Sequence, residues 1–155
     1  MQGNVGALTM EKVEMEELTC GLRLQWRAIG QVEIDDQSKL RFPRVSTAPG
    51  IYRFRISRTG GTKALYIGES DNLQRRFSHY RTPGPTQQTN LRISALLLDL
   101  LGTDGEVAVA VSETAWITMS SNEKKADFSY KSHRRLFEQF AITAEHASDI
   151  ESLNR

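Results

Sequence analysis

Three tyrosines and one arginine between positions 52 and 80 have side chains suited to phosphate chemistry. Arg76 carries a planar, permanently charged guanidinium that suits the non-bridging oxygens of a phosphate as charge grows on them. Tyr52, Tyr66 and Tyr80 carry hydroxyls that can orient a water molecule or hold a phosphate oxygen. A free phenol has a pKa of about 10, so a tyrosine that acts as a base needs nearby cations or an onward route for its proton. Each tyrosine alone is more typical of a core residue with its hydroxyl at the rim, whereas three that converge on Arg76 indicate a site.

Two strands are expected to carry Tyr52 and Tyr66. Residues 51–57 alternate between an apolar face with Tyr52, Phe54 and Ile56 and a face that holds two arginines, and residues 63–68 form the returning strand of a hairpin. A loop of odd length, or a bulge, places position 54 opposite 66 and position 52 opposite 68. We therefore predict such a loop, because it puts both phenols on one face of the sheet. Phenols on opposite faces would contradict a shared site.

A helix that begins at Ser70 or Asp71 and runs through Tyr80 is expected to carry Arg76. Its apolar stripe consists of Leu73, Phe77 and Tyr80, with Arg76 among them. An arginine at such a position is either buried against an anion or extends to the edge of the core. The stripe aims this helix at the sheet that carries the tyrosines.

The remaining elements follow from periodicity and turn residues. Residues 91–101 predict an apolar helix that ends at Gly102, and the strict alternation of residues 106–112 predicts a third strand. Residues 21–34 fit a strand, with a helix as the alternative, and residues 114–130 are expected to be a loop. The last helix, residues 131–147, is expected to bury Leu136, Phe137, Phe140, Ala141 and Ala144.

The order and spacing of these residues resemble the GIY-YIG endonuclease superfamily. Gly50-Ile51-Tyr52 and Tyr66-Ile67-Gly68 match its two tripeptides, and Arg76 follows Gly68 at the family's spacing of eight residues. Tyr80 stands where members carry Tyr or His. The segment RRLFEQFAI resembles the family's glutamate segment, with Glu138 as the counterpart, and Asn154 resembles its terminal asparagine. The resemblance covers roughly residues 49–154.

The resemblance implies an α+β fold with a three-stranded antiparallel sheet flanked by helices. Residues 49–155 would form the nuclease-like domain, and residues 1–48 an N-terminal extension packing on the core. The implied activity is metal-dependent DNA hydrolysis, in which Tyr52 activates water and Glu138 holds one Mg²⁺ or Mn²⁺ ion. One carboxylate suffices, because Mg²⁺ keeps most of its waters and also binds the substrate phosphate. The alternative is a non-catalytic nucleic-acid-binding module that retains the fold.

Two features depart from the family pattern. Glu69 follows the second tripeptide where many members have Lys or Ser, so Lys63 or Arg75 would have to supply the missing cation. The periodicity of the last helix places Glu138 off the apolar stripe, near Arg134 and Glu145, which is typical of a solvated surface glutamate.

Charge is distributed unevenly along the chain. The net charge is +1, but residues 37–96 hold eleven basic and two acidic residues, so this segment carries +9 and the remainder −8. Such asymmetry predicts a positive face for a polyanion, and the alternative is a solvated basic surface that binds nothing. The residues expected to contact DNA are Arg53, Arg55, Lys63, Arg75, His79, Arg81 and Asn154.

Several classes of protein are set aside by what the sequence lacks. No apolar run approaches the roughly 20 residues of a membrane span, so we expect a cytoplasmic protein with no membrane partner. The histidines are not spaced for zinc, and the chain has no phosphate-binding loop for a nucleotide cofactor. Cys20 has no cysteine partner and is expected to be at least half-buried. Neither the oligomeric state nor the DNA target follows from the sequence.

Overall fold

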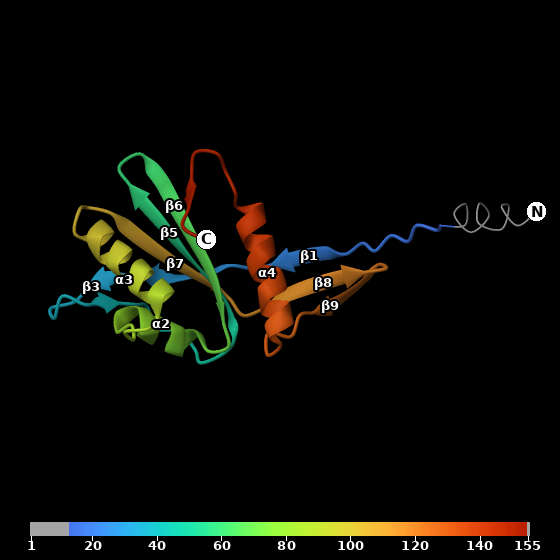
Figure 1. The fold of residues 1–155 in the computed structure, drawn as a ribbon, viewed down its shortest axis with the longest axis horizontal. Helices are drawn as coiled ribbons and strands as arrows, with labels where there is room; N and C mark the ends of the chain where they lie inside the picture. The colour runs from blue at the N-terminus through green and yellow to red at the C-terminus, as the bar shows by residue number, and fades with distance from the viewer. Residues whose placement is uncertain (1–12, 155) are drawn as a thin grey trace, which may run out of the picture.

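A five-stranded sheet forms the centre of the protein (Figure 1). The structure, a computed structural model, describes residues 13–154. The strand order is β10-β6-β5-β7-β2. The five strands are β2 (Arg27–Gln31), β5 (Gly50–Arg58), β6 (Gly61–Ser70), β7 (Glu106–Ser112) and β10 (Glu151–Ser152).

The three expected strands are present as antiparallel neighbours, but the prediction of a three-stranded sheet was incomplete. β2 adds to β7 in antiparallel orientation, and the two residues of β10 add to β6 in parallel orientation. A strand of two residues has no periodicity to detect. In β2, the pairing with β7 shifts register at a bulge next to Gly30, which interrupts the alternation.

The hairpin of β5 and β6 has the predicted register. Tyr52 lies opposite Gly68, and Phe54 lies opposite Tyr66. The pairing shifts by one residue after Ile56, so a bulge accompanies the tight turn. The turn glycines Gly60 and Gly61 have φ angles of 100° and 109°, which side chains rarely adopt. The bulge prediction is therefore confirmed, and Tyr52 and Tyr66 lie on one face.

Three helices within residues 13–154 pack on the two faces of β5 and β6 (Figure 1). α2 (Leu73–Arg81) and α3 (Gln88–Leu101) lie on one face, and α4 (Lys131–Ala144) lies on the far side of β6. The cap of α2 is Asn72, whose side chain accepts a hydrogen bond from the Arg75 backbone N–H at 2.9 Å, so the predicted cap at Ser70 or Asp71 was wrong. The Ser70 hydroxyl instead donates to the Asn72 carbonyl.

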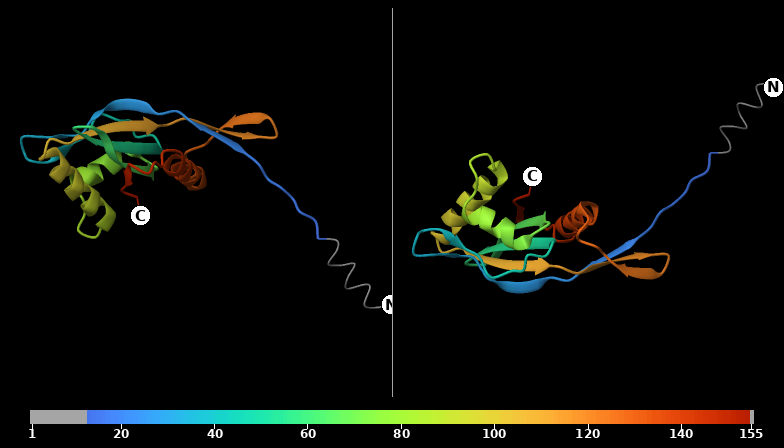
Figure 2. Two further views of the ribbon diagram at one scale, coloured as in Figure 1. Left: turned by 90° about the horizontal axis from the view of Figure 1, so that it is seen from above. Right: turned by 90° about the horizontal axis from the view of Figure 1, so that it is seen from below.

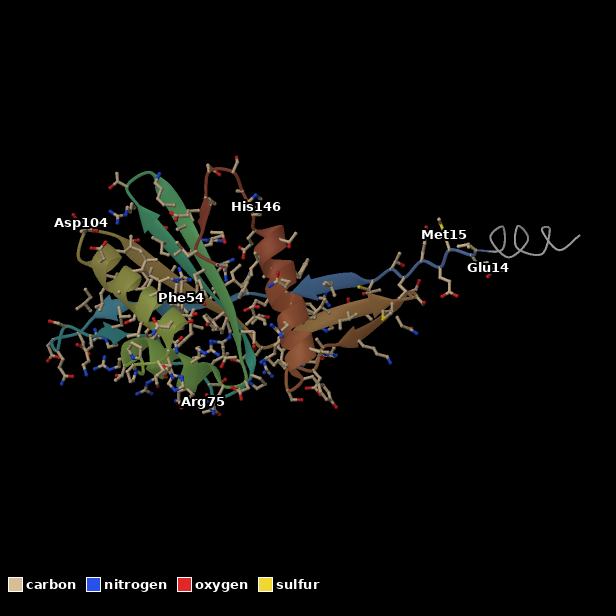
Figure 3. The ribbon with its side chains drawn as sticks, viewed as in Figure 1. Glu14, Met15, Phe54, Arg75, Asp104 and His146 are labelled. Atoms are coloured by element: carbon tan, nitrogen blue, oxygen red, sulfur yellow. The ribbon has the colours of Figure 1, made fainter. Side chains whose placement is uncertain are left out.

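The alternation of β5 and β6 divides the core in two. Tyr52, Phe54 and Tyr66 pack with the buried faces of α2 and α3, and Phe54 lies inside this layer (Figure 3). Ile51 and Ile67, on the opposite face, pack against α4. Each face of the sheet thus receives one apolar set, as the period of two requires.

α4 buries a different face from the one predicted. Phe137 and Ala141 are buried as expected, and Phe140 is half-buried, but Leu136 is 40% exposed and Ala144 is exposed. The buried face is rotated to include Arg134, because an ion pair to the sheet neutralises its charge. This rotation brings Glu138, one residue after Phe137, toward β6.

A second sheet of three strands projects from the body on the α4 side (Figure 2). Its strands are β1 (Gly21–Leu24), β8 (Ala115–Met119) and β9 (Asn122–Lys125), so the predicted loop over residues 114–130 was wrong. All four residues of β9 are polar and exposed, so the strand has no apolar alternation from which it could be predicted. Arg23 stacks over the Trp116 ring at 3.8 Å.

Residues 21–34 form the short strands β1, β2 and the first strand of a small hairpin, so the strand prediction is confirmed and the helix alternative is wrong. A small hairpin of β3 (Glu33–Ile34) and β4 (Leu40–Arg41) follows β2. The domain boundary at residue 48 remains a prediction, and residues 1–12 of the expected extension lie outside the described residues. Cys20 is exposed, contrary to expectation. None of the helices in residues 13–154 is long and apolar enough to span a membrane.

Candidate active site

The three tyrosines and Arg76 converge between the sheet and α2. The hydroxyl oxygens of Tyr52 and Tyr80 are 2.6 Å apart, and Arg76 Nη1 donates to the Tyr52 hydroxyl at 3.4 Å. The Tyr66 ring lies 6.3 Å from that of Tyr52 and 6.5 Å from that of Tyr80, between centroids. Arg76 is half-buried at the edge of an otherwise apolar stripe. Its charge is thus directed at the phenol cluster.

Burial keeps the inner phenols protonated. Tyr52 and Tyr80 are fully buried, and this burial raises the pKa of each above that of a free phenol. Tyr66 raises the pKa of Tyr52 further, and Tyr52 and Tyr66 together raise that of Tyr80. The charge on Arg76 and the hydrogen bond with Tyr80 lower the pKa of Tyr52 without offsetting its burial. Tyr52 therefore stays a neutral phenol near pH 7, able to donate as well as accept a hydrogen bond.

The two glycines of the tripeptides leave space for neighbouring atoms. A Cβ on Gly68 would lie 2.3 Å from the Tyr52 hydroxyl oxygen, and a Cβ on Gly50 would lie 2.5 Å from the Ser112 carbonyl oxygen. Both distances are far below van der Waals contact. Gly68 thus leaves space for the ring and hydroxyl of Tyr52 beside β6, and Gly50 allows β5 to approach the end of β7.

Replacing Gly68 by Ala is expected to displace the Tyr52 ring and break its hydrogen bond with Tyr80. We expect a loss of about 1–3 kcal/mol in the free energy of unfolding, because an overpacked core must shift. Urea denaturation measures this loss, and near-ultraviolet circular dichroism reports the tyrosine environment. Gly21→Ala is the matched control, since its Cβ meets Thr118 at an ordinary 3.6 Å. Equal stabilities of the two variants would contradict the assigned role of Gly68.

Glu138 reaches the same site from α4. It lines a pocket of about 530 Å³ together with Tyr66, Gln88, Thr89, Arg92, Gln139, Ile142 and Asn154. Glu138 is half-buried, so its interpretation as a solvated surface residue was wrong. Burial raises the pKa of its carboxyl, the charge on Glu69 raises it further, and the charges on Arg135 and Arg76 oppose this. A divalent cation would relieve the cost of the buried carboxylate.

The donor set fits a divalent ion that is bound mainly by water and phosphate. Residues 13–154 contain no group of three or more His, Cys, Asp or Glu side chains placed to enclose a metal. Glu138 is a single carboxylate in a polar pocket, which matches the way Mg²⁺ binds through one or two carboxylates and a substrate phosphate. The pocket, at about 530 Å³, has room for a hydrated metal ion and a phosphate group.

A buried ion pair ties α4 to the sheet beside this site. Arg134 Nε donates to Glu69 Oε2 at 2.9 Å, and the two side chains are only 8% and 15% exposed. Arg134 Nη1 also donates to the carbonyl oxygens of Phe128 and Ser129. Glu69, the departure from the family pattern, thus anchors the helix that carries Glu138.

The residues expected to contact DNA occupy varied surroundings. Arg53 and Arg55 lie on the α4 face of β5, and both contact Glu145, at 2.5 and 3.4 Å. Arg75 lies on the outer side of α2, paired with Asp71 (Figure 3). Arg81 binds Asp35 and the Leu40 carbonyl. Lys63 is exposed beside the hairpin turn, and His79 is half-buried on α2.

Asn154 completes the pocket from the C-terminal segment. Its side-chain amide accepts from the Ile67 backbone N–H at 3.0 Å and donates to the Ile67 carbonyl at 2.5 Å. Asn154 thereby continues the pairing of β10 along the edge of β6.

Sequence reasoning gave no role to two residues of the site, Arg92 and Arg134. Arg92 is the single basic residue of the largely apolar helix α3. A charged residue on an apolar helix face is the same signal that singled out Arg76 on α2. Arg134 gave no such signal, because its burial depends on Glu69, which is 65 positions away in the chain.

The fold is an α+β fold in which α2 and α3 cover one face of the sheet and α4 the other. A bacteriophage T4 EndoII mutant has a similar solved structure, with a TM-score of 0.55 and 18% sequence identity. The match covers 77% of this chain and 87% of that chain. The chain therefore shares its fold with this phage protein. No protein-family model matches the sequence, and no curated protein does.

Proposed function

We propose that this protein is a metal-dependent DNA endonuclease of the GIY-YIG type. The observation that carries the proposal is the convergence of the Tyr52–Tyr80–Arg76 cluster with a pocket shared by Tyr66 and Glu138. These groups come from β5, β6, α2 and α4, and all belong to the set that the sequence singled out. The fold shared with bacteriophage T4 EndoII supports the same proposal.

In this function Glu138 would bind Mg²⁺ or Mn²⁺, which supplies Lewis-acid stabilisation of the leaving oxygen. Arg76 binds the non-bridging oxygens of the scissile phosphate, where charge grows during hydrolysis. Tyr52 accepts a hydrogen bond from Arg76, and its phenol, kept neutral by burial, would orient the attacking water by hydrogen bonding. Tyr80 fixes the Tyr52 hydroxyl, and Tyr66 holds the nucleophile or phosphate at the pocket.

The surroundings of the basic residues suggest a division of roles. Lys63 and His79 keep the proposed role of contacting the DNA backbone, because neither is buried and neither pairs with a carboxylate within residues 13–154. Arg75 keeps it as well, because its pair with Asp71 is more than half exposed on both sides, whereas Glu145 and Asp35 are only 21% and 10% exposed. The carboxylate partners of Arg53, Arg55 and Arg81 favour a supporting role for these three residues. Asn154 holds the C-terminal segment against Ile67 and so shapes the pocket.

The protein is expected to nick supercoiled plasmid DNA with Mg²⁺ or Mn²⁺ and to lose this activity completely when EDTA removes the metal. Gel separation of supercoiled, nicked and linear plasmid measures the conversion. A panel of duplex, flap and branched substrates then defines the target. Salt-dependent DNA binding without any metal-dependent cleavage would instead favour the non-catalytic binding module.

A further inference from the structure

Arg92 faces the candidate active site but has no role in the proposed mechanism. It lies on α3, in the wall of the pocket that also contains Tyr66 and Glu138. Its Nη2 atom donates to the Leu153 carbonyl oxygen at 3.1 Å. A guanidinium has five N–H donors, so this bond orients the side chain and leaves most donors free for a ligand.

The basic segment, residues 37–96, contains Arg92 and ten other basic residues with which it can be compared. Five of its eleven basic residues pair with carboxylates: Arg41, Arg53, Arg55, Arg75 and Arg81. Four others are exposed to solvent: Lys39, Arg44, Arg58 and Lys63.

Arg76 and Arg92 are the two that remain. Both are half-buried, and neither has a carboxylate partner within residues 13–154. A guanidinium that has lost part of its hydration and has no counter-charge is costly, and an anion in the pocket would relieve that cost. The two unpaired charges lie at the same site, one at the phenol cluster and one in the pocket wall.

We propose that Arg92 binds a second phosphate, adjacent to the scissile one, on the strand that is cut. This inference rests on the proposed function, in which Arg76 binds the scissile phosphate and Glu138 would hold the metal. At about 530 Å³ the pocket is of the size that holds small-molecule ligands, so it accommodates more than the scissile group. Gln88 and Thr89 add an amide and a hydroxyl beside Arg92, and such groups commonly contact phosphate and sugar oxygens.

Arg92 is therefore a positioning residue that sets the path of the strand. It fixes the register of the scissile bond without touching the reacting atoms. Its loss is expected to weaken binding and to raise KM, with little change in kcat once the site is saturated.

The test uses Arg92→Gln, which removes the charge and retains a donor toward Leu153. Binding of labelled duplex is measured by fluorescence anisotropy in a Glu138→Gln background, so that the DNA stays uncut. We expect about tenfold weaker binding at physiological salt and a decrease of about one in the slope of log K against log salt. Arg92→Lys, which keeps the charge, should restore the slope. Arg58→Gln, an exposed arginine far along β5, is the matched control.

A scan with methylphosphonates gives a readout that a purely structural residue would not affect. Each phosphate of the cut strand is replaced in turn by a neutral methylphosphonate. One position, adjacent to the cleavage site mapped with the wild-type protein, should weaken binding when Arg92 is present and have no further effect in Arg92→Gln. An unchanged salt slope, or a scan with no position coupled to Arg92, would overturn the inference. Failure of the wild-type protein to cleave DNA would overturn the proposed function instead, since the salt slope is measured on uncut DNA.

Discussion

Replacing Glu138 by Gln is expected to abolish metal-dependent cleavage, with a decrease of at least about 10³-fold in kcat, and to stabilise the metal-free protein. The side chain keeps its shape but loses the charge that, in the proposed function, would hold the metal. The carboxyl pKa is raised in the folded state, first by burial and then by Glu69, so the fold binds this proton more tightly than the unfolded chain does. The contribution of the Glu138 carboxyl to the free energy of unfolding therefore falls as the pH rises through its pKa. Gln carries no charge, so it removes the cost of burying the carboxylate at pH 7.

Plasmid nicking and thermal unfolding without metal measure the two effects of Glu138→Gln. The unfolding temperature should rise by about 2 °C at pH 7, and the difference should vanish in acid. Glu106→Gln is a suitable control, because Glu106 is exposed on β7 and should change neither property. Normal cleavage by Glu138→Gln would exclude Glu138 as the metal ligand.

Arg76→Lys should lose cleavage by about 10²–10³-fold while still binding DNA, since an ammonium cannot reproduce the planar fork of donors.

Replacing Arg134 by Ala is expected to cost about 3–5 kcal/mol in the free energy of unfolding. The substitution leaves the Glu69 carboxylate, which is 15% exposed, without its partner, and it removes donors from Phe128 and Ser129. It also loosens the attachment of α4 to β6, so Glu138 should lose its position relative to Tyr66. Urea denaturation measures the stability, and plasmid nicking at a temperature where the variant is folded measures the loss of activity.

The exposed pair of Arg75 and Asp71 is the control for Arg134. These side chains are 54% and 60% exposed, so Arg75→Ala should change stability by less than about 0.5 kcal/mol. Combining Arg134→Met with Glu69→Gln should recover part of the lost stability, because no unpaired charge remains buried. An Arg134→Ala variant within about 1 kcal/mol of wild type would show that this pair does not anchor α4.

The core hairpin was predictable because its information is local. Alternation in residues 51–57, a turn with two glycines and the tripeptide spacing predicted both strands, the bulge and the shared face of Tyr52 and Tyr66. The helix with Arg76 and the strand at residues 106–112 followed from the same kind of pattern. β9 and β10 could not be found, since one is wholly polar and the other has two residues.

The position of Glu138 illustrates the limit of helical periodicity. The apolar pattern of α4 predicts that Leu136 and Ala144 lie in the core and that Glu138 lies in solvent. The helix instead buries Arg134. A buried arginine is permitted only where a carboxylate meets it, and that carboxylate, Glu69, belongs to β6. No pattern within α4 contains this information.

The sequence by itself determined the chemical groups of the site and the strands and helix that carry the tyrosines and Arg76, because side-chain period and turn chemistry act over a few residues. Only the tertiary structure decided which groups meet. It brought Glu138 to Tyr66, added Arg92 to the same pocket, and paired Arg53 and Arg81 with acids from outside the basic segment. The physical reason is that burial of charge is decided by partners distant in the chain, which become neighbours only when the sheet and helices pack.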